Sequence, residues 1–217
     1  MATHAERRPS ISAVPAAIQS RRCHGSLDAI TDSERRGLRP IGITAREVAG
    51  RTGTLLMDLF ALPGVQIFQG VRPSAGDVPP ISHAVSAGRM LVLVESVAWP
   101  PGRYATTAAG QIHCDGVYIG QSVRPLITAV RHWQQALPVG HLVHALVVVH
   151  PIAAGDLALP VPDRPELDWA AACDAVHNLR AWLPRGRRPA SATAIAVLAA
   201  ATTGEQAGDH EPPPCDR

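Results

Sequence analysis

Two neighbouring apolar segments carry the side chains in this chain whose types and spacing could do chemistry. One segment holds Ser82 and His83, and the other, residues 90–95, ends in Glu95. A Gly-Arg pair separates them, which is typical of a short hairpin turn, so the segments are predicted to pair as antiparallel strands. A carboxylate on one strand beside polar groups on the next strand can bind a divalent cation. The pattern therefore indicates metal-assisted phosphodiester chemistry as the first hypothesis.

The partners that this chemistry needs are mostly missing. Nucleases of the Asp…(Asp/Glu)-x-Lys type bind the cation with two acidic residues on adjacent strands, and a lysine two residues after the second one orients the attacking water. Here Val97 stands two residues after Glu95, and all 20 basic residues of the chain are arginine. Arginine stays charged and transfers protons poorly. One carboxylate therefore remains of the set that cleavage requires.

Other side chains nearby have both a functional and a structural interpretation. Asp77 lies in a Pro/Gly loop and could replace the missing acidic residue, although a solvated turn residue is the simpler interpretation. His83 is interpreted as a structural residue. Glu95 is interpreted either as a remaining metal ligand or as the polar end of a buried strand. Trp99 and Tyr104 could stack on a nucleic-acid base, although such residues more often cover the end of a sheet.

The elements that must position these residues alternate between helical and strand-like patterns. A helix is predicted from Thr44, where Thr44-x-x-Glu47 forms a capping box, to Pro63-Gly64. The apolar patterns then predict six strands and three further helices, the last of them Ala-rich. The strands are expected at 65–71, 81–87, 90–95, 104–108, 111–114 and 142–150, and the helices at 122–137, 168–183 and 190–201. The strand–helix–strand passage favours parallel pairing. The predicted fold class is α/β, with a mixed central sheet flanked by helices.

Length and composition indicate one domain with tails. The chain has 217 residues, of which 46% are hydrophobic, so it can form a sizeable core. The predicted division is a poorly ordered arm (1–40), a nuclease-related domain (41–185), an Ala-rich helix (186–203) and a disordered tail (204–217). The net charge of +2 is too small to imply a nucleic-acid partner through its field alone.

Cysteine spacing and apolar segment length indicate the compartment. The four cysteines show no metal-ligand spacing, so neither a zinc site nor a disulfide framework is predicted. No apolar segment approaches the roughly 20 residues of a membrane helix, and no signal peptide is recognised. A cytoplasmic protein without a membrane partner is expected.

Taken together, these motifs resemble the nuclease-related domain (NERD) family, a branch of the restriction-endonuclease-like superfamily. The resemblance covers about residues 44–185. It is carried by the Gly-rich first helix, the strand with His83, the apolar strand that leads into Glu95, the Trp99…Pro-Gly-x-Tyr104 turn, and the later helix and apolar strand between Trp133 and His150. The resemblance implies a restriction-endonuclease-like mixed sheet and, in an intact member, a Mg²⁺-dependent nuclease.

The chain departs from the family at the residues that catalyse. Where the family carries Glu, Asp and Lys, this sequence has Thr54, Ser82 and Val97, and Glu95 alone matches. The resemblance therefore implies a pseudoenzyme without a cofactor. We expect Glu95, Ser82 and Thr54 to lie close together, with Val97 facing the same hollow.

Three functions are compatible with these residues. The first is a catalytically degenerate domain that binds DNA, another nucleic acid or a protein partner without cleavage. The second is an active nuclease whose Mg²⁺ site is rebuilt from Glu95, Asp77 and His83. The third is an interaction or scaffold protein with no nucleic-acid role, because a fold alone does not determine function.

Overall fold

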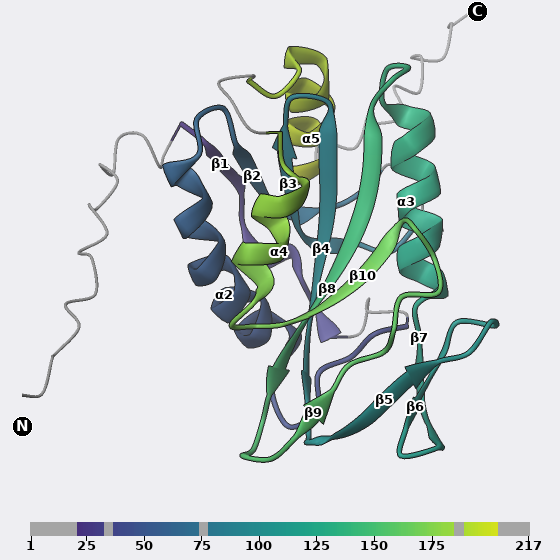
Figure 1. The fold of residues 1–217 in the computed structure, drawn as a ribbon. Helices are drawn as coiled ribbons and strands as arrows, with labels where there is room; N and C mark the ends of the chain where they lie inside the picture. The colour runs from purple at the N-terminus through teal and green to yellow at the C-terminus, as the bar shows by residue number, and fades with distance from the viewer. Residues whose placement is uncertain (1–20, 33–36, 74–77, 185–188, 204–217) are drawn as a thin grey trace, which may run out of the picture.

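A six-stranded mixed sheet forms the centre of the computed structural model, which describes residues 21–32, 37–73, 78–184 and 189–203 (Figure 1). In spatial order the strands are β1 (Cys23–Gly25), β2 (Gln66–Val71), β3 (Ile81–Ala87), β4 (Met90–Trp99), β8 (Leu142–Pro151) and β10 (Leu167–Ala171). The middle strands β2, β3 and β4 form an antiparallel meander. Strand β1 runs parallel to β2, β8 runs parallel to β4, and β10 runs parallel to β8. The predicted α/β class and the predicted hairpin are both confirmed.

A smaller sheet extends beyond one end of the large one, in the lower part of Figure 1. Its strands, in spatial order, are β7 (Val117–Ser122), β6 (Gln111–Cys114), β5 (Gly102–Thr106) and β9 (Leu157–Ala158). Strand β4 leads into β5 through two prolines, which cannot donate the hydrogen bonds of a continuing ladder. The break therefore redirects the chain from one sheet into the other.

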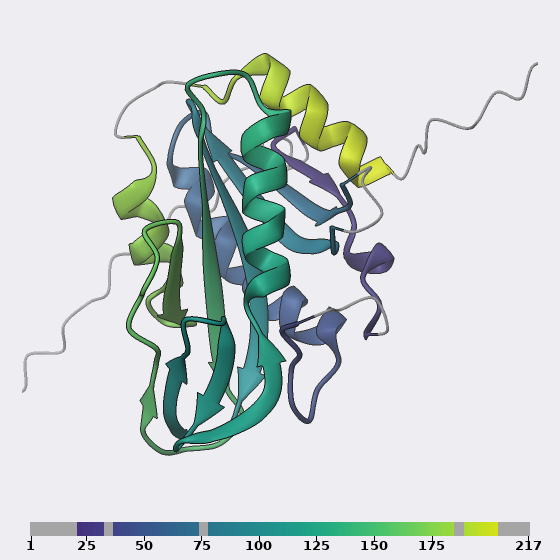
Figure 2. The ribbon, with the colours of Figure 1, turned by 90° about the vertical axis from the view of Figure 1, so that its right-hand side faces the viewer.

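Helices cover both faces of the large sheet (Figures 1 and 2). One face packs against α2 (Ala45–Leu56), the 3-10 turn η3 (Met57–Ala61) and α4 (Ala175–Trp182), and the other against α3 (Arg124–Ala136) and α5 (Ala192–Thr203). Along β4, Leu93 and Val97 belong to the core under α3, whereas Val92 and Val94 belong to the core under α2. This alternation follows from the two-residue period of a strand. Within the described residues, no helix has the length and apolar character that a bilayer crossing requires.

The first helix begins as its sequence predicts. The Thr44 hydroxyl accepts a hydrogen bond from the Glu47 backbone N–H at 3.2 Å, and the Glu47 carboxylate accepts one from the Thr44 N–H at 3.0 Å. These bonds satisfy two of the N–H groups that a helix start leaves without intrahelical partners. The capping box is confirmed.

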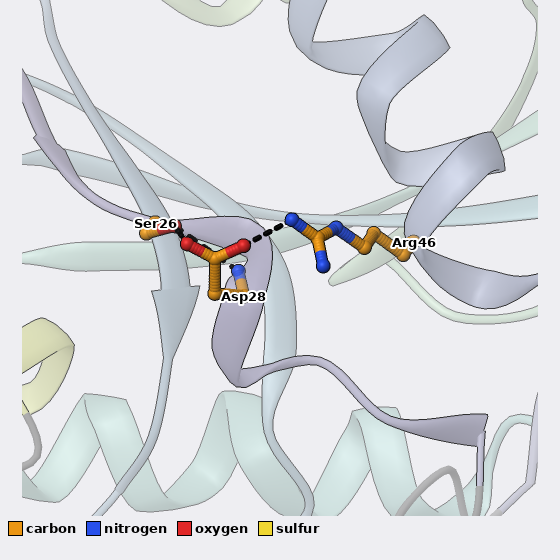
Figure 3. Close-up of polar contacts among 3 residues, drawn as sticks. All are labelled: Ser26, Asp28 and Arg46. Atoms are coloured by element: carbon orange, nitrogen blue, oxygen red, sulfur yellow. Dashed lines mark hydrogen bonds and ion pairs between the residues drawn. The ribbon is translucent and has the colours of Figure 1, made fainter.

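A surface contact joins the same helix to the 3-10 turn η1 (Leu27–Ala29), as Figure 3 shows. The Asp28 carboxylate forms an ion pair with the Arg46 guanidinium and accepts a hydrogen bond from the Ser26 hydroxyl at 2.7 Å. The Arg46 and Asp28 side chains are 62% and 68% exposed, so water screens the pair and its contribution to stability is small.

The predicted N-terminal arm is wrong for part of its length. Arg22 donates hydrogen bonds to the carbonyl oxygens of Val65, Phe60 and Leu62 at 2.8, 3.0 and 2.5 Å, and it also lies over the Phe60 ring. Burial lowers the pKa of its guanidinium. These contacts hold β1 against β2, and sequence periodicity could not detect a three-residue strand of this kind. Residues 1–20 of the predicted arm and the predicted tail lie outside the described residues.

Other elements also differ from the prediction. Strand β4 continues to Trp99, so Glu95 lies inside the strand rather than at its end. Strand β7 occupies residues 117–121, which were not assigned, and Ser122, which was predicted to begin a helix. The predicted helix at 168–183 begins with β10, which pairs with β8. The strand at 167–171 forms because β8 offers a buried parallel neighbour, a long-range contact that local propensity does not contain.

Candidate site around Glu95

Glu95 lies on the α3 side of β4, next to Ser82 of β3. His83 pairs with Val94 across the two strands, so Ser82 and Glu95 follow as neighbours. The Ser82 hydroxyl donates a hydrogen bond to Glu95 Oε1, and the Ser96 backbone N–H donates to the same oxygen at 2.9 Å. The predicted proximity of these two side chains is confirmed, and Glu95 as a whole residue is only 6% exposed.

The space in front of the carboxylate is a small pocket. Its volume is about 20 Å³, which is room for about one water molecule. The lining is largely apolar, since Ser122 and Glu95 are its polar members beside Leu38, Pro79, Pro80, Ile81 and Leu126. A phosphodiester group is several times larger than one water, so the pocket as it stands does not admit a nucleic-acid backbone.

Residues 37–41 pack beside this pocket, and Leu38 forms part of its lining. Leu38 is 5% exposed and packs into the same core as the α3 residue Leu126. Three backbone contacts hold the segment in place: the Gly37 carbonyl accepts from the Ser122 N–H at 3.1 Å, the Arg39 N–H donates to Gln121 Oε1 at 3.1 Å, and the Ile41 N–H donates to the Ala98 carbonyl at 2.8 Å. The segment is therefore part of the folded core, although it lies largely within the predicted arm.

The other two family positions do not join the pocket. Val97 lies on the same face as Glu95 but is fully buried in the apolar core, outside the pocket lining. Thr54 is exposed on α2, on the opposite face of the sheet, and its hydroxyl donates to the Gly50 carbonyl at 3.1 Å. The prediction that Thr54 adjoins Glu95 is wrong, because α2 covers the other side of β4.

A chain of buried polar groups lies on that opposite face instead. The Ser96 hydroxyl donates to Thr52 Oγ1 at 2.8 Å, and Thr52 Oγ1 is hydrogen-bonded to His150 Nε2 at 2.8 Å. The contacts connect β4, α2 and β8 in one network. The sequence interpretation missed Thr52, although its spacing of four residues from Val48 places both on the buried face of the helix.

The three residues proposed to contact a ligand are core residues. His83 is fully buried against α2, where a Cβ at Gly53 would lie 3.0 Å from its Nε2 atom, so glycine at this position favours the close approach of the helix. Trp99 is fully buried and stacks on Tyr104 at 4.4 Å between ring centroids. Burial raises the pKa of Tyr104, whose hydroxyl donates to the Pro100 carbonyl at 2.9 Å.

The residues around Glu95 do not fit a Mg²⁺ site. Among the residues that the structure describes, no group of three His, Cys, Asp or Glu side chains could hold a metal ion. The pocket offers one carboxylate, one oxygen of which already accepts two hydrogen bonds, and Mg²⁺ requires near-octahedral oxygen coordination. His83 points to the opposite face of the sheet, and Asp77 lies outside the described residues.

His150 is expected to make stability depend on pH. Burial, and then the nearby positive charge of Arg51, lower the pKa of this imidazole from its usual value of 6.5. Below pH 6.5 the unfolded chain takes up a proton at this residue more readily than the folded chain does. The neutral imidazole of His150 therefore contributes to the stability of the folded state. We expect this stabilisation to be fully present above pH 6.5 and to be lost as the pH falls towards the lower folded-state pKa.

The measurement is the free energy of unfolding in urea at several pH values between about 7.5 and 5, a window around the imidazole pKa. His150→Gln should lose stability less steeply than the unmodified protein as the pH falls. His177→Gln, at an exposed position on α4, removes one imidazole elsewhere and is the matched control. Equal slopes for the unmodified protein and His150→Gln would show that the buried imidazole does not contribute.

Comparison with models of known families, with curated proteins and with solved structures found no match to this chain.

Proposed function

We propose that this protein is a catalytically degenerate nuclease-related domain that binds nucleic acid without cleaving it. The mixed sheet supports this proposal, because a hairpin places a carboxylate beside the residue at the family's aspartate position. The sequence resemblance implies the same arrangement. A cytoplasmic location belongs to the proposal, since nucleic acid is accessible there.

The environment of Glu95 is the main reason to expect no cleavage. Its carboxylate accepts hydrogen bonds from Ser82 and from the backbone of Ser96, at the base of a pocket of about 20 Å³. Cleavage needs a cation held against the scissile phosphate and a water activated beside it. Ser82 supplies a neutral group where an anion is required, and Val97 supplies an apolar one in the core. Loss of such groups reduces the rate by about a thousandfold or more.

The rebuilt nuclease is the less favoured alternative. It needs His83 and Glu95 to converge on one cation, but His83 shares its face of the sheet with Val94, and Glu95 faces the other side. A scaffold role without nucleic acid uses none of the features on which the resemblance rests. The binding experiment below distinguishes this role from nucleic-acid binding.

The test combines cleavage and binding with the same purified protein. Labelled single- and double-stranded DNA and RNA are incubated with Mg²⁺ or Mn²⁺ and examined on denaturing gels, and binding is measured by fluorescence anisotropy at several salt concentrations. We expect no product above the protein-free control. We also expect binding that weakens as salt rises, because phosphate contacts release counterions.

Two outcomes would overturn the proposal. Metal-dependent cleavage by the unmodified protein that Glu95→Gln abolishes would favour the rebuilt nuclease. Failure to bind every nucleic acid tested at low salt would favour the scaffold role. Because Glu95→Gln preserves the shape of the side chain, its unfolding curve serves as the control for a merely structural loss.

A further inference from the structure

The outer face of the small sheet differs in chemistry from its inner face. Tyr104 and Ile112 are 5% and 0% exposed and pack into the core. Because successive residues of a strand point to opposite sides, Arg103 and Ala105 of β5 and His113 of β6 point outward. The face that remains open to solvent is therefore basic and aromatic rather than aliphatic.

Strand register brings these outward residues into one row. Ala105 pairs with His113, and His113 pairs with Tyr118, so the row crosses β5, β6 and β7. Tyr118 is 49% exposed, and its ring lies 5.8 Å from the His113 ring at 45°. Ala105 leaves a low point at one end of the row. The half-exposed Tyr118 ring, with the half-buried His113 ring beside it, offers a face on which a planar group could stack.

Arginine side chains stand around this row. Arg103 is exposed two residues before Ala105, and its guanidinium has no ion-pair partner within the described part of the chain. Arg164 reaches the β5–β6 turn and donates to the Ala108 carbonyl at 3.1 Å. Arg124 lies at the same turn, where a Cβ at Gly110 would be 3.2 Å from its Cγ. Positive charge is thus available at both ends of β5.

Two acidic groups lie at this surface and oppose that charge in part. The Asp163 carboxylate forms an ion pair with Arg164 at 4.0 Å. Asp115 occupies the β6–β7 turn, and its carboxylate accepts the backbone N–H of Arg103 at 3.0 Å. The hydrogen bond occupies one carboxylate oxygen and leaves the Arg103 guanidinium exposed. The three arginines outnumber these two carboxylates by one, so the surface suits a sparsely charged anion that also carries planar groups.

We propose that the outer face of β5, β6 and β7 binds single-stranded nucleic acid, with a base on the Tyr118–His113 row and phosphates near Arg103. This inference rests on the proposed function and gives it a site. A duplex keeps its bases stacked inside, whereas a single strand can place them on exposed rings. The site uses Arg103, His113 and Tyr118 of the small sheet, and none of these residues lines the pocket at Glu95.

The experiment measures binding of a fluorescein-labelled oligothymidylate by anisotropy. Tyr118→Ala should weaken binding by about tenfold, the usual effect of losing one stacked base, whereas Tyr118→Phe should bind as the unmodified protein does because the ring remains. Arg103→Ala should weaken binding and reduce the salt slope by about one. Arg180→Ala removes an exposed charge on α4 and is the matched control, with little expected effect. Circular dichroism and urea unfolding verify that each variant folds.

The outcomes separate the site from the function. If the unmodified protein binds the oligonucleotide and both Tyr118→Ala and Arg103→Ala bind equally well, this site is overturned and the proposed function survives. If the unmodified protein binds no nucleic acid, the proposed function falls and the site falls with it. If duplex DNA of matched length binds more tightly than the single strand, the assignment to single strands is overturned.

Discussion

Val97→Lys is expected to destabilise the domain by about 3–5 kcal/mol, a large part of the 5–15 kcal/mol typical of a whole domain. Val97 is fully buried in the core between the sheet and α3, and it pairs with Val149 of β8. A lysine there must either bury its charge or lose its proton. The substitution introduces the residue type that the sequence resemblance implies at this position, yet the structure offers an apolar environment there.

Val97→Met separates charge from size in this experiment. Methionine has a similar length and no charge, so its cost should be that of overpacking, about 1–3 kcal/mol. The lysine variant should be less stable than the methionine variant by urea unfolding at pH 7. Because the ammonium pKa is lowered in the folded state, that deficit should shrink as the pH rises towards about 10. Equal stability of the two variants would mean that the ammonium reaches Glu95 and its pocket, as the family geometry requires.

Local signals predicted the elements whose hydrogen bonds and apolar period lie within a short stretch of chain. The capping box at Thr44 and Glu47 formed because both partners lie within four residues. The hairpin of β3 and β4 formed because two long apolar runs meet at a Gly-Arg turn. Strand β8, ten residues long and buried in its centre, could be recognised from its apolar content alone.

The predictions that failed depend on long-range contacts. Packing decides which face of β4 the first helix covers. Because α2 covers the face opposite to Glu95, Thr54 is separated from Glu95, whereas Thr52 contacts Ser96. Leu38 became a core residue because α3 and the start of β3 leave a hollow that it fills. A single apolar residue between polar and proline neighbours carries no periodic signal for such a role.

The candidate site contains predictions of both kinds, those that local strand pairing decides and those that long-range packing decides. Ser82 and Glu95 were predicted to meet because strand pairing fixes their register, and they do meet. Trp99 and Tyr104 were considered for base stacking because their types suit it, but type does not determine exposure. The exposed aromatic residue is Tyr118, on a strand that the sequence interpretation did not assign. The exposure of a residue on the small sheet depends on which face of that sheet packs against the core. The whole fold decides which face that is.

Trp99 connects the two sheets, and Trp99→Ala is expected to cost about 3–5 kcal/mol of unfolding free energy. Its ring is fully buried at the end of β4, 4.4 Å from the Tyr104 ring and 5.6 Å from the Trp169 ring between centroids. Alanine would leave a cavity where the large sheet, β5 and β10 meet. Urea unfolding followed by circular dichroism measures the loss without relying on tryptophan emission.

Trp99→Phe is the matched control, because it keeps an aromatic ring in the stack. The Trp99 indole N–H is buried without a hydrogen-bond partner among the described residues, so phenylalanine removes no hydrogen bond and should cost much less than alanine. The small sheet holds the proposed binding face, and Tyr104 anchors that sheet against Trp99. Trp99→Ala should therefore also weaken oligothymidylate binding under conditions in which the variant remains folded. A variant that loses less than about 1 kcal/mol would mean that the ring stack contributes little and that strand pairing alone holds the two sheets together.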